Sequence, residues 1–409
     1  MVSILINLLN NNKYFPYFIV STLIYSFGNV CEQLDISNRV SSNKKKKLIL
    51  IKFYWFQNLL NYKICNKNIF NSLVFKRKLN TAEIIFFKTL EIILNLEFAI
   101  IRAFVVFVRK FFNIHFYDNI NFIQLGVSTY MFNNKTLFIS EYNSIEPYPI
   151  YAPNIYIKKN KDNLCKNIIS KKIDIKKKII CLHVRDHLFH DDKGKRDFRN
   201  ADVNNYIKTI KYLIYKNYTV IRLGNYMQKE IKYTHPNFFQ YNFSEINSPL
   251  MDIFLIKNCF CYIGTSSGPV DISFMFQKPT LLTNSINVLT GLPRNYQDRV
   301  LFKKIYYRNK KVSIENFIDF DFSFHDPSLL QKKSLNFVEN TPNEILQSSI
   351  KFINDIEKKN NTLSKKQIIF KLKVKNSVKN KFINDNYFKS NKVALRYIKW
   401  TKTFQGTII

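Results

Sequence analysis

The sequence is short of acidic residues: 29 Asp and Glu stand against 63 Lys and Arg, a formal net charge of +34. Such an excess favours an anionic partner, whether phosphate, nucleic acid or an acidic membrane surface. Lys, Ile and Asn are abundant along the whole chain, however, so a biased genome explains the charge equally well. Apolar residues make up 46% of the chain, which excludes a disordered protein by composition.

Cysteine and histidine are also scarce, with six of each in 409 residues. No two cysteines form a Cys-x-x-Cys pair, and Cys181, Cys259 and Cys261 lie inside apolar runs, where a thiol behaves as a small hydrophobic group. This pattern excludes a disulfide framework and indicates a reduced, cytosolic compartment. Three of the six histidines gather within residues 177–192.

A signal peptide is not expected, because the apolar residues 14–31 lack a basic segment before them and a small-residue cleavage site after them. Their length is marginal for a membrane span, and polar residues dilute them. If they do span, the basic residues 44–47 hold the following domain in the cytoplasm. Residues 82–113 repeat apolar residues at helical spacing but carry charges, which favours a long core helix; the alternative is a helix on a membrane surface.

The length suggests two or three domains. From about residue 176, short apolar strands alternate with helical patterns, which predicts an α/β fold with a parallel sheet covered on both faces. Thr341 and Glu344 form a capping box ahead of a further helix. We therefore expect an apolar N-terminal segment (1–45), an N-terminal domain (46–170), an α/β C-terminal domain (171–357), and a basic tail or appended helices (358–409).

Three predicted strands end in polar residues, at 183–186, at 222–224 and at 264–268. Ligands of open parallel sheets bind at the carboxyl ends of the strands. The third end, Gly-Thr-Ser-Ser-Gly, precedes a helix and combines hydroxyls with free N–H groups, which suits phosphate oxygens. It lacks a Walker lysine, which excludes a P-loop ATPase. The alternative is an ordinary serine-rich helix cap, and Asp271 either competes for the N–H groups or accepts from a sugar hydroxyl.

The other two strand ends supply cations and proton acceptors. Arg185 and Arg222 are suited to hold a diphosphate, and His183 or Asp186 is the candidate general base. A metal site built on His183, His187, His190 and Asp191 is disfavoured, since Arg185 shares a strand face with His183. Residues 319–321, Asp-Phe-Asp, are interpreted as incidental. We predict neither a metal nor a cofactor.

Taken together, four stretches resemble a family of bacterial glycosyltransferases of the GT-B type that are found with surface-polysaccharide genes. They are ICLHVRD (180–186), DFRNADVNNYIKTIKYLIYKNYTVIRLG (197–224), DIFLIKNCFCYIGTSSGPVDISFMFQKPTLLTN (252–284) and NTPNEI (340–345). The resemblance covers roughly residues 160–355 and rests on the order and spacing of the motifs. The family's N-terminal arginine-glycine-histidine signature is not evident, which leaves the acceptor side open.

The resemblance implies two Rossmann-like domains, an acceptor-side one and a C-terminal one that binds a nucleotide-sugar donor. The acceptor is then a glycan or lipid-linked molecule, and the enzyme is cytoplasmic, with peripheral contact to the inner face of the cell membrane as a further expectation. Carried over by position, the catalytic residues are His183, Arg185 and Asp186. The donor-binding residues are Arg199, Asn200, Asp202, Tyr206, Arg222, Gly224, Gly264, Thr265, Ser266, Ser267, Gly268, Asp271 and Asn284. The rival hypothesis is a non-catalytic basic protein that binds nucleic acid or an anionic membrane.

Overall fold

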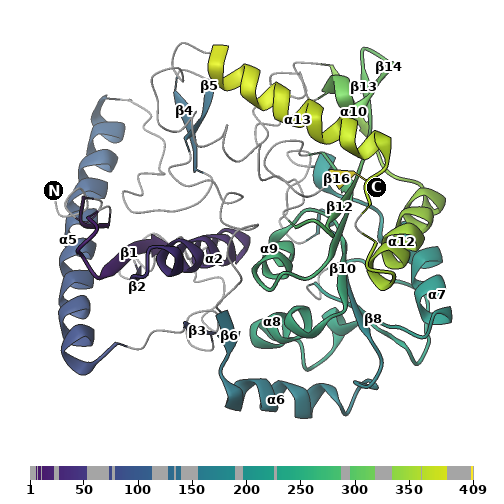
Figure 1. Cartoon of the computed structure of the whole chain (residues 1–409), viewed down its shortest axis with the longest axis horizontal. Coiled ribbons are helices and arrows are strands. Elements are labelled where there is room, and N and C mark those ends of the chain that lie inside the picture. Colours follow the sequence, from purple (N-terminus) through teal and green to yellow (C-terminus); the bar gives the residue numbers. More distant parts are fainter. Residues whose placement is uncertain are drawn as a thin grey trace. The chain divides into compact units, whose positions relative to one another are not determined.

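A computed structural model describes most of the chain, which divides into two compact units, Met1–Tyr156 and Ile157–Ile409 (Figure 1). The described residues are 6, 8–10, 12–22, 27–52, 73–75, 79–112, 128–132, 135–139, 155–188, 197–224, 228–286, 295–317, 334–360, 362–384 and 407–408. Among them, the cysteines are buried and free.

The first unit contains a parallel pair of strands, β1 (Tyr17–Thr22) and β2 (Lys47–Lys52), joined by α2 (Phe27–Asn43). The helix α5 (Thr81–Phe112) packs Phe87 and Leu94 into the core that these strands form, so the helix predicted at 82–113 is confirmed. The other described elements of this unit are β3 (Leu73–Phe75), an antiparallel hairpin of β4 (Ser128–Phe132) and β5 (Lys135–Ile139), and most of β6 (Ile155–Ile157). No described helix offers an apolar stretch long enough to cross a bilayer.

The second unit is built on a parallel sheet of seven strands in the order β16-β12-β11-β10-β7-β8-β9. This confirms the predicted α/β class with a parallel sheet; the two-domain GT-B arrangement stays a prediction. The strands are β7 (Ile179–His183), β8 (Thr219–Arg222), β9 (Phe238–Phe239), β10 (Cys261–Gly264), β11 (Thr280–Ser285), β12 (Arg299–Phe302) and β16 (Thr407–Ile408).

Helices cover this sheet, and their ends match local signals in the sequence. α8 (Pro249–Asn258) starts with Ser248, whose side chain accepts from the backbone of Met251. α12 (Pro342–Glu357) starts with the predicted capping box of Thr341 and Glu344. α7 (Ile207–Tyr215) and α12 share one apolar core with β7, β8 and β10. The strand β7 is buried along its whole length, which explains its continuous apolar run.

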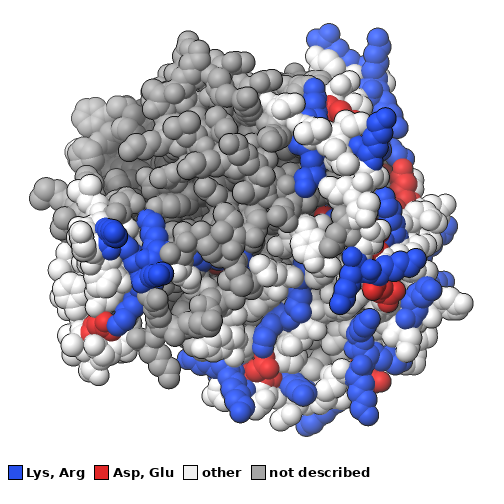
Figure 2. Space-filling model, in the orientation of Figure 1, with Lys and Arg blue, Asp and Glu red and all other residues white. Residues whose placement is uncertain are grey.

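The remaining elements of the second unit lie around this core. They are α6 (Lys159–Ile169), α9 (Gly268–Met275), α10 (Ile314–Phe317), α13 (Lys365–Asn384), the short helices η1 (Asp197–Arg199), η2 (Val203–Tyr206) and η3 (Tyr241–Phe243), and an antiparallel sheet of β14 (Lys310–Val312), β13 (Lys304–Tyr307) and β15 (Leu335–Val338). On the face in Figure 2, Lys and Arg side chains are spread over this unit from α6 to α13.

The order of the strands defines where a ligand site is expected. From β7 the chain first builds β8 and β9 on one side, then crosses to build β10, β11 and β12 on the other. These six strands have the 3-2-1-4-5-6 order of a doubly wound nucleotide-binding sheet. The direction of winding reverses between β7 and β10, so the crevice outside their carboxyl ends is the topological switch point.

Candidate functional site

Two of the three predicted strand ends meet at this switch point. Gly264 of β10 pairs with His183 of β7, and the N–H of Thr265 donates to the His183 carbonyl at 3.0 Å. The Thr265 hydroxyl in turn accepts from the N–H of Arg185 at 2.8 Å. A Cβ on Gly264 would lie 2.0 Å from the His183 carbonyl oxygen, so only glycine allows this approach. The structure therefore joins the 183–186 and 264–268 motifs directly.

The ring of His183 faces the start of α9. Its Nδ1 lies 2.9 Å from the hydroxyl of Ser267, which precedes the helix and makes no capping bond with its side chain. Burial lowers the pKa of His183 to about 3, and the charges of Arg222 and Arg185 add to this effect. His183 is therefore neutral near pH 7 and a weak proton acceptor. The contact looks like the serine–histidine pair of a hydrolase, but such a weak base does not activate a serine.

Cationic side chains gather around η1 and the start of α9. Arg185 is 6% exposed and donates its Nε to the side chain of Asn200 at 3.0 Å. Arg199 donates Nη2 to the carbonyl of Ser266 at 3.1 Å. Lys303, directly after β12, donates to the Asn200 carbonyl at 2.6 Å, and burial lowers its pKa. Arg199 thus holds the loop that follows β7 against the loop that follows β10. Arg185 braces the first of these loops internally, and Lys303 ties it to the end of β12.

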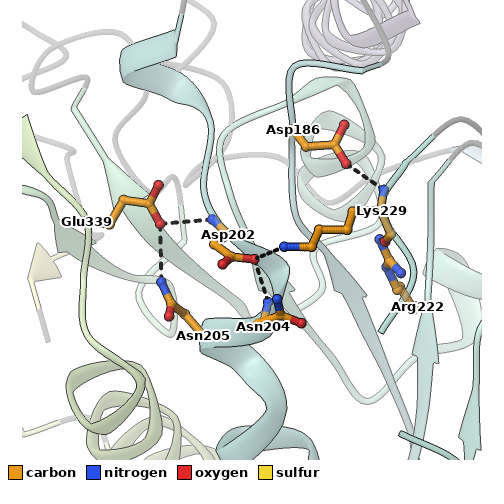
Figure 3. A network of polar contacts seen from close by, with 7 residues as sticks. All are labelled: Asp186, Asp202, Asn204, Asn205, Arg222, Lys229 and Glu339. Atoms are coloured by element: carbon orange, nitrogen blue, oxygen red, sulfur yellow. Dashed lines mark hydrogen bonds and ion pairs between the residues drawn. The ribbon is translucent and has the colours of Figure 1, made fainter. Parts of the chain in front are cut away.

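The third predicted strand end, after β8, connects to the first through Lys229 (Figure 3). Asp186 accepts from the N–H of Lys229 at 3.1 Å and from that of Leu188 at 3.2 Å. The fully buried Arg222 donates to the side chain of Gln240 at 2.9 Å and to the carbonyl of Lys229. Burial lowers the pKa of Arg222 to about 10, so it stays charged near neutral pH. The hydrogen bonds of its guanidinium thus go to protein groups.

Asp202 lies at the centre of a polar network at the start of η2 (Figure 3). Its carboxylate accepts from the N–H of Asn204 at 3.0 Å and lies 3.4 Å from the ammonium of Lys229. Glu339, directly after β15, accepts from the N–H of Asp202 at 2.9 Å and from the side chain of Asn205 at 3.3 Å. The network brings three separate loops together at one edge of the sheet.

Tyr206 and Asn284 lie in the interior at the end of β11. The Tyr206 hydroxyl lies 2.6 Å from that of Thr283 and accepts from Asn284 at 3.1 Å. Burial raises the pKa of Tyr206 to about 12. Asn284 and Asn340 exchange two hydrogen bonds of 2.7 Å between their backbone N–H groups and side-chain oxygens. These predicted donor-binding residues fix β11 against the start of α12.

The remaining predicted residues are placed as follows. Gly224 has φ of +140°, a conformation that L side chains rarely adopt, and its carbonyl accepts from Asn247. Asp271 lies in the first turn of α9. Among the described residues no group of three His, Cys, Asp or Glu could hold a metal ion. His187 is exposed, whereas His190, Asp191 and residues 319–321 lie outside the described residues.

Lys229, Lys303, Glu339 and Asn340 were missed from the sequence. Lys303 directly follows β12 of the parallel sheet, so the strand-end argument would find it once that strand is recognised. β12 is short and its burial does not alternate, which hides it in the sequence. Glu339 and Asn340 follow β15, which pairs in the antiparallel sheet, so the strand-end argument does not apply to them. Lys229 follows the end of β8 by seven residues in a loop without periodicity, and no signal marks it.

Comparison with known proteins adds little to this geometry. No protein-family model and no curated protein matches the sequence. The solved structure of ADP-heptose LPS heptosyltransferase II of E. coli is similar with 13% identity and a TM-score of 0.30, over 51% of this chain and 54% of that chain. The chain thus spans about half the length of this structure. A likeness this slight carries no argument, so the site stands on its own contacts.

Proposed function

We propose that the chain is a glycosyltransferase that moves a sugar from a nucleotide-sugar donor to a glycan or lipid-linked acceptor in surface-polysaccharide synthesis, without a metal ion. The switch point is the observation that supports it, because β7 and β10 present the 183–186 and 264–268 motifs side by side. Sheets with this strand order bind nucleotides there. The resemblance of the same motifs to bacterial glycosyltransferases of the GT-B type supplies the reaction class.

Electrostatic stabilisation of the leaving diphosphate is the main chemical task in this proposal. Arg185 supplies a cation whose Nε is oriented by Asn200, and the start of α9 supplies the positive end of a helix dipole. Arg199 anchors the turn before α9, whose first backbone N–H groups form that positive end, by donating to the carbonyl of Ser266. Preorganised donors of this kind stabilise the charge that develops in the transition state.

The two candidate bases, His183 and Asp186, lie in different surroundings. A pKa of about 3 makes His183 a neutral group that orients the hydroxyl of Ser267. Asp186 is the other candidate, and its carboxylate oxygens accept from the N–H groups of Leu188 and Lys229. The measurement that tests Asp186 is the turnover of Asp186→Asn, which should fall about 10²- to 10⁴-fold if Asp186 is the base.

The test combines ligand binding with one substitution. Thermal melting against ADP-, GDP-, UDP- and CMP-linked sugars should show stabilisation by one nucleotide class. Arg185→Ala should lower transfer from that donor about 10²- to 10³-fold with the fold intact. Lys208→Ala on α7, which loses one exposed hydrogen bond to Asn343, is the control and should keep full activity. Near-normal turnover in Arg185→Ala contradicts the role of Arg185. No stabilisation by any donor, with salt-sensitive nucleic-acid binding, favours the rival basic binder.

A further inference from the structure

The backbone N–H and the backbone carbonyl of Lys229 are both hydrogen-bonded to charged side chains. The Asp186 carboxylate accepts from its N–H at 3.1 Å, and the Arg222 guanidinium donates to its carbonyl. Asp186 and Arg222 are 8% and 0% exposed, and they come from the ends of neighbouring strands. Burying two ionised groups is costly, so a turn that needed only hydrogen bonds would be satisfied more cheaply by neutral partners.

The residues on both sides of Lys229 are fixed as well. Gln228 is buried and donates to the carbonyl of Val184 at 3.0 Å. Gln240 binds the backbone of Ile231 twice, accepting from its N–H at 2.9 Å and donating to its carbonyl at 3.0 Å. The backbone of residues 228–231 is therefore rigidly placed at the carboxyl edge of the sheet, and the Cα of Lys229 with it.

The side chain of Lys229, in contrast, is only loosely engaged. Its ammonium lies 3.4 Å from a carboxylate oxygen of Asp202, and the two side chains are 55% and 45% exposed. An exposed pair at this separation contributes little to stability, so the ammonium exchanges partners readily. The same Asp202 oxygen already accepts from the N–H of Asn204. Figure 3 shows the lysine reaching from its fixed backbone toward Asp202.

We propose that Lys229 binds a phosphate of the donor's diphosphate, and that Asp186 and Arg222 act as positioning residues for it. The inference rests on the proposed function and assigns that site a cation which the sequence does not mark. Lysine binds phosphate as a point charge on a flexible stem. A fixed backbone with an exposed, weakly paired ammonium at the strand edge meets this requirement.

The test is isothermal titration of the wild type, Lys229→Met, Lys229→Arg and Lys232→Met with ADP, GDP and UDP. Lys232 is an exposed lysine three residues further on and serves as the matched control. Lys229→Met should bind the preferred diphosphate about tenfold or more weakly, as expected for the loss of a charged hydrogen bond. The affinity of the corresponding nucleoside, which has no phosphate, should not change. Lys229→Arg should recover most of the affinity, and Lys232→Met should match the wild type.

Four results overturn the proposal, and they are distinguishable. If the wild type binds a diphosphate and Lys229→Met binds it equally well, Lys229 has no such role while the proposed function stands. If the wild type binds none of the three and no nucleotide sugar of the melting panel stabilises it, the proposed function and the inference fall together. If only a CMP-linked sugar stabilises it, the inference alone falls. Lys229→Met should melt close to the wild type, since it loses only an exposed pair. A loss of affinity shared by diphosphate and nucleoside would mark a structural defect and also count against the proposal.

Discussion

Gly264→Ala tests the switch-point geometry most directly. The added Cβ would lie 2.0 Å from the carbonyl oxygen, 2.9 Å from the carbonyl carbon and 3.1 Å from the nitrogen of His183. All three are backbone atoms, so no change of rotamer relieves the contact. The ends of β7 and β10 must move apart until the closest contact reaches at least the 3.4 Å of ordinary packing.

The cost of that separation follows from the bonds that cross it. Overpacking in a tight interior costs about 1 to 3 kcal/mol. Moving the strands apart also strains the hydrogen bonds from Thr265 to His183 and from Arg185 to Thr265, each worth about 1 kcal/mol. The expected loss is about 3 to 5 kcal/mol, which lowers the melting temperature of a unit of this size by roughly 6 to 20 °C.

Urea unfolding followed by circular dichroism, together with thermal melting, measures this loss. The midpoint should fall while the slope stays near that of the wild type, because the surface exposed on unfolding is similar. Ser266→Ala, two residues on, leaves the backbone bond to Arg199 in place and should melt within about 2 °C of the wild type. A Gly264→Ala protein as stable as the wild type would refute the register that pairs Gly264 with His183.

Two opposing pH effects are also expected. Burial lowers the pKa of His183 to about 3 from 6.5, so the unfolded chain binds a proton that the folded chain refuses, and stability falls as pH decreases from about 6.5 to 3. The fall amounts to at most about 1.4 kcal/mol per pH unit, and His183→Asn should remove it. Burial raises the pKa of Asp252, in the first turn of α8, to about 7 from 3.8. Stability therefore falls as pH rises from about 4 to 7, and Asp252→Asn should flatten that slope. Urea midpoints at pH 4 to 7 measure both, and a wild-type slope in either variant contradicts the corresponding assignment.

The parts of the fold that the sequence predicts correctly are those encoded locally. β7 reads as a strand because every one of its residues is buried, and α8 and α12 begin at Ser248 and Thr341 because these side chains cap them. The sequence also predicts that the polar residues after the predicted strands lie along one edge of the sheet, because parallel strands all end at the same edge. The order of the strands in the sheet does not follow from the sequence. Gly264 lies beside His183, rather than beside Arg222, because the chain crosses the sheet after β9.

Arg222 shows why the site is harder to predict than the fold. At a strand end after an apolar run, its sequence context is the same as that of Arg185. Its partners decide its position, and they lie at Gln240, 18 residues away, and at the backbone of Lys229. Every residue has a backbone carbonyl, so the sequence does not indicate which one accepts from Arg222. Motif reasoning therefore identifies the edge of the sheet but not which of its cations reaches a ligand.

The burial of the cations also separates the two functional hypotheses. A protein that binds nucleic acid through phosphate contacts needs its Lys and Arg side chains on the surface, where they displace counterions. Arg185, Arg222 and Lys303 at the carboxyl edge are 6%, 0% and 4% exposed, and their bonds hold specific loops. Removing such charges from water is unfavourable unless well-placed hydrogen-bond partners compensate for the lost hydration. A protein that binds nucleic acid through surface charges has no need to bury them. The burial of these three cations therefore supports the proposed binding of one small anionic ligand at this edge, to which Lys229 adds an exposed cation.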